Sequence, residues 1–110
     1  MTLIDMNVYN MLKEATGAEF IHELVNAFLE DTPVQFEQMR SALAAGDSEV
    51  FCRAAHTIKS NAATLGANQL ASLARELEKI GREGNLAVGS RLEVLHEAFE
   101  QVKNQLDELS

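Results

Sequence analysis

The sequence predicts an all-α protein, an antiparallel up-down four-helix bundle with a short extra helix at its N-terminus. Apolar residues recur at helical spacing through most of the 110 residues. Alanine, leucine and glutamate, which all favour helices, are abundant. The single proline and six glycines fall mostly where helices would start or stop. Four amphipathic helices with short connections bury their apolar faces together, so residues 1–110 are expected to form one domain.

The first half of the chain predicts a short helix and then a long one. Asp5 can cap a helix that runs to about Ala15. Thr16 and Glu19 match a T-x-x-E capping box, so the long helix is expected to open there. Pro33 interrupts that helix, but the apolar stripe keeps nearly the same phase on both sides, which favours one kinked helix over two. The stripe consists of Phe20, Ile21, Leu24, Val25, Phe28, Phe36, Met39 and Leu43.

A helix of intermediate length is predicted next. Gly46 ends the long helix, and Asp47 or Ser48 can cap the one that follows. Gly66 is a typical left-handed terminator and is expected to close it. The side chains expected to face the core are Val50, Phe51, Ala54, Ile58, Ala62 and Leu65.

Two more amphipathic helices complete the bundle. Asn68 can cap the first, which is expected to end between residues 81 and 89. Ser90 and Glu93 form a capping box for the last. The first would turn Leu70, Leu73, Leu77 and Ile80 inward and Arg75, Lys79 and Arg82 outward, and the last would bury Leu92, Leu95, Phe99, Val102 and Leu106.

One histidine stands out because of its direction. On a helical wheel, the apolar side chains between residues 50 and 65 form one arc, and His56 lies roughly 160° from its middle. The imidazole is therefore expected to face solvent. Its neighbours on the helix surface are three small side chains and one cation, which leave the ring accessible and put positive charge where an anion would bind. These neighbours are Cys52, Lys59, Ser60 and Ala63.

The segment HTIKSNAATLG resembles the histidine-containing phosphotransfer (HPt) domain of multistep phosphorelays. It has that family's histidine, a lysine three positions later, a small residue next and a glycine ten positions after the histidine. The segment FLEDTP and the chain length add to the likeness, which covers nearly the whole chain. Ser60 stands where the family commonly has glycine, and its hydroxyl adds a donor and some bulk.

The resemblance implies that His56 is phosphorylated on its outer ring nitrogen by a receiver-domain phosphoaspartate or by a histidine kinase. It also implies that Lys59 contacts the phosphoryl oxygens and that Gly66 sets the turn after the site. The surface expected to dock a response-regulator receiver domain or a hybrid histidine kinase comprises Cys52, Arg53, Thr57, Ser60 and Ala63.

For phosphoryl transfer of this kind, the protein has to supply little more than a nucleophile, the correct position of the reacting groups and charges that stabilise the transition state. A histidine near neutral pH mostly keeps a free lone pair. We therefore expect a carrier with no cofactor of its own, with Mg²⁺ supplied by the receiver. The chain has no G-x-x-x-x-G-K loop for a nucleotide, so intrinsic kinase activity is not expected.

The amino-acid composition excludes some classes of binding partner. Nine basic and 17 acidic residues give a net charge of −8, which repels nucleic acids and anionic membranes. The single cysteine excludes an internal disulfide. No signal peptide or membrane-spanning run is evident, so a cytoplasmic protein is expected. A monomer is also expected.

Two other interpretations remain at this stage. One is a helical adaptor that is never phosphorylated. The other is a di-iron or di-manganese carboxylate bundle, because Glu19-x-x-His22 and Glu93-x-x-His96 have the ligand spacing of such enzymes. Both glutamates are already explained by capping boxes, and the other helices offer no buried glutamate on their apolar arcs, which argues against the metal site.

Overall fold

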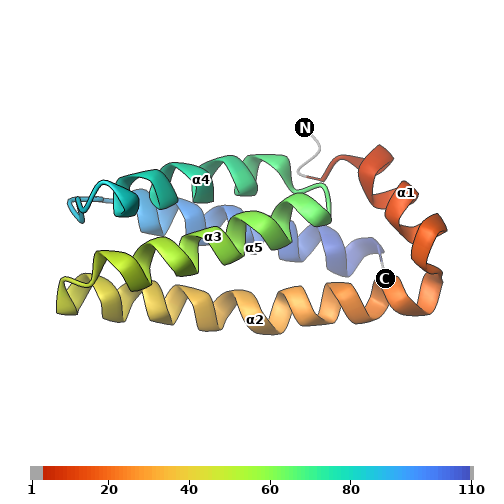
Figure 1. The fold of residues 1–110 in the computed structure, drawn as a ribbon. Helices are drawn as coiled ribbons and strands as arrows, with labels where there is room; N and C mark the ends of the chain where they lie inside the picture. Colours follow the sequence, from red (N-terminus) through yellow and green to blue (C-terminus); the bar gives the residue numbers. More distant parts are fainter. Residues whose placement is uncertain (1–3, 110) are drawn as a thin grey trace.

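The computed structural model describes residues 4–109, which form five helices and no strand. The helices after the first lie side by side in an elongated antiparallel bundle, and the first helix lies across one end (Figure 1). The predicted all-α bundle with an extra N-terminal helix is confirmed. The helices are α1 (Met6–Thr16), α2 (Ala18–Ala45), α3 (Ser48–Thr64), α4 (Asn68–Arg82) and α5 (Arg91–Leu109).

Helix α2 runs the length of the bundle and contains Pro33, so the prediction of one helix over two is confirmed. A proline inside a helix removes one backbone donor. The neighbouring Thr32 is buried, and its hydroxyl donates to the carbonyl of Phe28 at 2.7 Å. This hydroxyl thus stays satisfied inside the core.

Several helix ends lie where the sequence placed them. The side chain of Asp5 accepts a hydrogen bond from the Asn7 amide, and Asp47 accepts one from the Val50 amide. Gly46 closes α2 in the left-handed conformation. These ends form as predicted because a short acidic side chain or a glycine settles each of them locally.

Two predicted caps are wrong. Thr16 belongs to α1, where its hydroxyl donates to the Leu12 carbonyl, and Gly17 with φ of 90° forms the turn into α2. No side chain caps that helix. Asn68 is the first residue of α4, so the cap position belongs to Ala67, whose side chain has no oxygen to accept a hydrogen bond.

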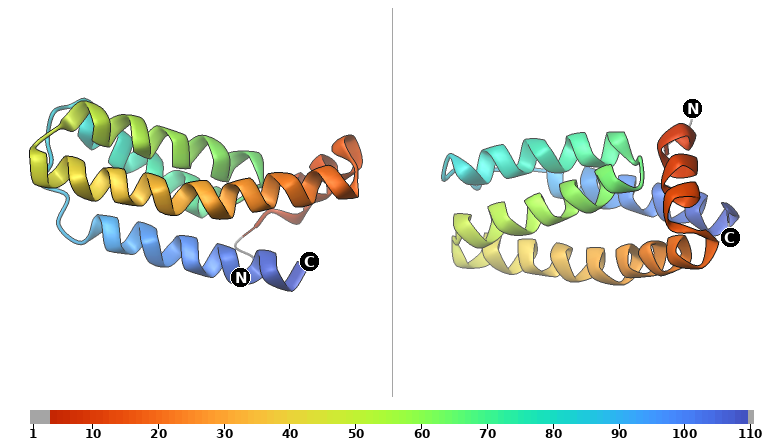
Figure 2. Two further views of the ribbon diagram at one scale, coloured as in Figure 1. Left: turned by 90° about the horizontal axis from the view of Figure 1, so that it is seen from below. Right: turned by 45° about the vertical axis from the view of Figure 1, so that its right-hand side comes forward.

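The turn between α3 and α4 holds the N-terminal segment in place. Gly66 has φ of +83°, and its carbonyl accepts a hydrogen bond of 2.8 Å from the Asp5 amide. A Cβ atom at Gly66 would come within 2.9 Å of the Asp5 carbonyl oxygen. Glycine is therefore required here by its conformation and by the close approach. The two views in Figure 2 show α1 crossing this end of the bundle.

Helices α3 and α4 approach closely at Gly81. A Cβ atom there would lie 3.0 Å from Cδ1 of Phe51 and 3.2 Å from Cα of Cys52. The absence of a side chain at this position brings the two helices together one turn from the candidate site.

The core lies between the four long helices. Three phenylalanine rings, Phe28, Phe36 and Phe99, pack in tilted contacts with centroids 5.5 and 5.8 Å apart. The inward face predicted for the third helix is confirmed, because Phe51, Ala54, Ile58, Ala62 and Leu65 are all buried and Val50 packs partly buried against the core. Across residues 4–109, no helix combines the length and hydropathy needed to cross a bilayer.

Candidate functional site

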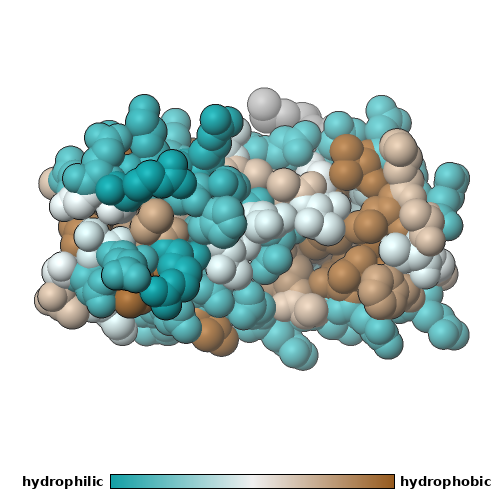
Figure 3. Space-filling model, in the orientation of Figure 1, coloured by the Kyte–Doolittle hydropathy of each residue, from teal (hydrophilic) through white to brown (hydrophobic). Residues whose placement is uncertain are grey.

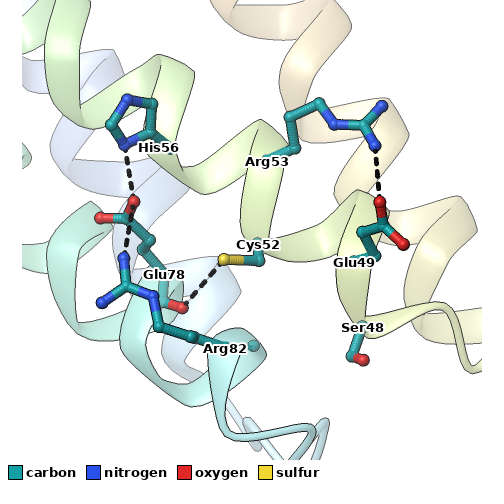
Figure 4. A pocket seen from close by; sticks show the side chains of 8 residues that line it. Ser48, Glu49, Cys52, Arg53, His56, Glu78 and Arg82 are labelled. Carbon is teal, nitrogen blue, oxygen red and sulfur yellow. Dashed lines mark hydrogen bonds and ion pairs between the residues drawn. The ribbon is translucent and has the colours of Figure 1, made fainter.

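His56 lies in the middle of α3, and its side chain is 57% exposed. The predicted exposure of this ring is confirmed. The ring is nevertheless held from one side, because Nδ1 lies 2.6 Å from Oε2 of Glu78 on α4. Figure 4 shows the carboxylate on the α4 side of the ring, with the other ring nitrogen pointing away from it.

Glu78 is the centre of the site, although its side chain is only 5% exposed. Its Oε1 accepts a hydrogen bond of 2.7 Å from Nζ of Lys59. Its Oε2, which contacts His56, also lies 3.3 Å from an Arg82 nitrogen. A buried carboxylate needs such partners, because an unpaired one would lose its hydration without compensation.

The charge state of Glu78 follows from these contacts. Burial acts to raise the pKa of its carboxyl, but the hydrogen bonds from Lys59 and His56 outweigh burial, so the pKa lies below the ordinary value of 4.5. The group is therefore ionised at neutral pH and can only accept hydrogen bonds. We accordingly assign the ring proton of His56 to Nδ1, which leaves a free lone pair on the outward Nε2.

A surface hollow lies beside the histidine ring. Its lining includes His56, Cys52, Arg53 and Arg82, with Gly81 at the point where the helices approach. Figure 4 shows these side chains arranged around the hollow, with Arg53 and Arg82 coming from different helices. The lining of this hollow thus includes guanidinium groups from both α3 and α4.

The predicted docking residues of α3 are mostly accessible. Arg53 is exposed and pairs with Glu49 at 3.2 Å. The hydroxyl of Thr57 donates to the Arg53 carbonyl. Ser60 and Ala63 are exposed further along the same helix.

Cys52, Lys59 and Gly66 are less accessible than the other predicted residues. The thiol of Cys52 turns inward and donates to the backbone carbonyl of Glu78 at 3.4 Å. The side chain of Lys59 is only 29% exposed, because Nζ turns to Glu78. Gly66 is buried in the turn after α3, as its predicted structural role requires.

The sequence interpretation missed Glu78. One signal was present: Glu78 follows the core residue Leu77 and lies one turn from two small residues of the same face, Ala74 and Gly81. A carboxylate on the border of a buried face needs a partner on the neighbouring helix. Which partner it finds depends on the packing of α3 against α4, which the spacing of residues does not show.

The two E-x-x-H pairs do not come together. Glu19 and His22 are exposed on α2, whereas His96 packs edge-on against Phe36 with a centroid distance of 5.0 Å. The expectation that no other helix buries a glutamate is wrong, because Glu78 is buried on α4, but its partners are a histidine and two cations. Within residues 4–109, no three His, Cys, Asp or Glu side chains are placed to hold a metal ion.

His56 is a solvent-facing imidazole that is held from behind by a buried carboxylate, and cations lie near it, so the site is suited to carrying an anionic group. The chain belongs to the Hpt domain family, whose sequence model matches residues 23–110. It is therefore a phosphotransfer intermediate of phosphorelays, a carrier and not a kinase.

A solved structure supports the same assignment. The chain is similar to histidine-containing phosphotransfer protein B (HptB) from Pseudomonas aeruginosa PAO1, with a TM-score of 0.90 and 26% sequence identity. The match covers 96% of this chain and 92% of the other. Among curated proteins, no sequence match was found. The family assignment favours a relay over the unphosphorylated adaptor and the di-metal enzyme.

Proposed function

We propose that His56 is the residue that accepts and donates the phosphoryl group, through Nε2. The lone pair of Nε2 attacks the phosphorus of a phosphoaspartate, and an N–P bond forms as the P–O bond to the aspartate breaks. The electrons of that P–O bond leave on the aspartate, which is released as a carboxylate. Donation is the same step in reverse.

The observation that carries this proposal is the contact of Nδ1 with Glu78 at 2.6 Å. It fixes the ring, keeps the proton on the inner nitrogen and leaves the outer one free. As Nε2 gives up its lone pair, the ring gains positive charge. The ionised Glu78 is already in place to balance that charge, so no group has to reorganise during the step.

Lys59 is proposed to contact the phosphoryl oxygens. In the unphosphorylated protein its Nζ lies 2.7 Å from Oε1 of Glu78, on the same carboxylate that holds His56. An ammonium group has three donors, so Nζ can keep this contact and offer another hydrogen to an arriving oxygen. Glu78 thereby positions the nucleophile and the cation together.

The proposed partners are a response-regulator receiver domain, a hybrid histidine kinase, or both. Of the proposed docking residues, Arg53, Ser60 and Ala63 are exposed and Thr57 is partly buried, and all four lie within two turns of His56 on α3. Mg²⁺ is proposed to reside on the receiver, where carboxylates and the phosphoryl group suit it. The monomeric state and the cytoplasmic location stay predictions from the sequence.

Incubation with a phosphorylated receiver domain tests the role of His56. The wild-type protein should acquire a phosphoryl group that is labile in acid and stable in base. His56→Gln should acquire none, whereas the matched controls His22→Gln and His96→Gln should be labelled like the wild type. Labelling of His56→Gln would overturn the proposal.

A further inference from the structure

Charge is distributed very unevenly between the two helices of the site and the rest of the protein. Helices α3 and α4 carry five of the nine basic residues and only three of the 17 acidic ones. Four basic and 14 acidic residues make up the rest. The helices of the site therefore have a net charge of +2, and the remainder of the chain has a net charge of −10.

Two of these five cations have no ion-pair partner in the part of the chain that the structure describes. Arg53, Lys59 and Arg82 pair with glutamates, but Arg75 and Lys79 do not. Both are exposed and lie one turn apart on α4. Neither an ion pair within the described residues nor burial explains their position.

These two side chains border the site directly. Arg75 and Lys79 line a second hollow together with Lys59, Glu78 and Arg82. Glu78 and Arg82 also line the hollow beside His56, so the two hollows adjoin each other along α4. Figure 3 shows strongly hydrophilic side chains over α4 and the adjoining part of α3, whereas the apolar part of this face lies beside α1.

We propose that Arg75 and Lys79 form a basic ridge that docks the acidic surface of the receiver domain. This inference rests on the proposed function. A receiver that holds Mg²⁺ needs carboxylates around its phosphoaspartate, so the part of it that approaches His56 carries negative charge. Cations beside the reacting histidine would attract that surface and orient it during encounter.

The charge pattern favours a compact acidic protein over a nucleic acid or an anionic membrane. A polyanion extends beyond the ridge and would meet the rest of the molecule, with its net charge of −10. A receiver presents its negative charge over a small area. Only a local acidic surface can use the ridge and avoid the repulsion from the other helices.

The test compares two double charge reversals with the same net charge. Arg75→Glu with Lys79→Glu alters the ridge, and Lys13→Glu with Lys103→Glu alters exposed residues of α1 and α5 that form no ion pair in the described chain. The second-order rate constant for transfer from a phosphorylated receiver is measured for each protein over a range of NaCl concentrations. Circular dichroism verifies that both variants fold.

The ridge variant should transfer about tenfold more slowly than the control at low salt, and the difference should shrink at high salt. Equal rates in the two variants would overturn the inference. So would binding of a fluorescent duplex oligonucleotide that the ridge variant loses, because the ridge would then serve nucleic acid.

Direct phosphorylation by phosphoramidate separates this inference from the proposed function. This small donor needs no docking surface, so both variants should be labelled on His56 at the wild-type rate. If phosphoramidate labels both variants and the receiver transfers to both at equal rates, the basic ridge is ruled out and the proposed function is unaffected. If neither donor labels His56 in the wild-type protein, both the proposed function and this inference are overturned.

Discussion

Nδ1 of His56 and Oε2 of Glu78 lie 2.6 Å apart across the interface of α3 and α4, and the contact joins an exposed ring to a buried carboxylate. The exposed partner can meet another protein, while the buried partner cannot move far. Reactivity and rigidity are thus divided between two residues on neighbouring helices.

Replacing Glu78 by glutamine keeps the shape of the side chain and removes its charge. The ring would lose the negative charge that balances the developing imidazolium, so phosphorylation of His56 should slow by roughly tenfold, by analogy with the loss of a carboxylate that orients a metal-ligating histidine. Rapid-quench measurement of transfer from a phosphorylated receiver checks this. An unchanged rate would show that Glu78 has only a structural role.

The stability of the fold should depend on pH through Glu78. Its pKa is lowered in the folded protein from an ordinary value of 4.5, so its ionised form is bound more favourably in the folded state than in the unfolded state. This contribution is fully present above pH 4.5 and is lost as the pH falls through the lower folded value. Urea denaturation of the wild type and Glu78→Gln between about pH 3 and pH 7 measures it. The advantage of the wild type should shrink below pH 4.5, and a constant difference would contradict this account.

Lys59→Ala should impair both stability and transfer. The side chain is 29% exposed and donates to Glu78, so its loss leaves a buried carboxylate oxygen without that partner and should cost about 1–3 kcal/mol in free energy of unfolding. Transfer should slow because a phosphoryl contact is lost.

Lys103→Ala is a suitable control for both measurements, because Lys103 is exposed on α5. Its free energy of unfolding and transfer rate should stay near the wild-type values. A Lys59→Ala variant with wild-type transfer rates would rule out the role proposed for this lysine.

Gly66→Ala should destabilise the protein more than Gly84→Ala. Both glycines have positive φ, 83° and 77°, so either substitution strains the backbone by about 1 kcal/mol. Only at Gly66 would the new Cβ meet other atoms, the nearest being the Asp5 carbonyl oxygen at 2.9 Å. The difference between their free energies of unfolding in urea therefore reports the contact of the N-terminal segment with the turn. Equal decreases in the free energy of unfolding would mean that the N-terminal segment moves aside without a measurable cost.

The direction of His56 could be predicted because it depends on a single helix and its apolar arc. The ends of α2 and α3 could also be predicted, since Gly46 and Asp47 determine them locally. Thr16 was misassigned because the sequence signature of a capping box does not show whether the preceding helix ends before it. Features that depend on the residues of a single helix or turn could thus be predicted from the sequence.

Glu78 could not be predicted because its role depends on the distance between two helices. That distance is set by Gly81, where a side chain would meet Phe51 and Cys52. The partly hidden position of Lys59 has the same origin, since Nζ turns inward only because the carboxylate is within reach. Sequence periodicity predicts which face of each helix is buried. It does not predict which side chains of the neighbouring helix contact that face.

Every side chain assigned to the chemistry here, and both residues of the basic ridge, lies on the consecutive helices α3 and α4. This helical hairpin therefore contains all the residues that we assign to phosphoryl transfer and to docking on α4. The other three helices serve as its support, and their surfaces are free to diverge or to join other domains while the reacting groups stay unchanged. Transplanting residues 48–82 onto a different bundle that preserves their packing would carry the reactive centre with them.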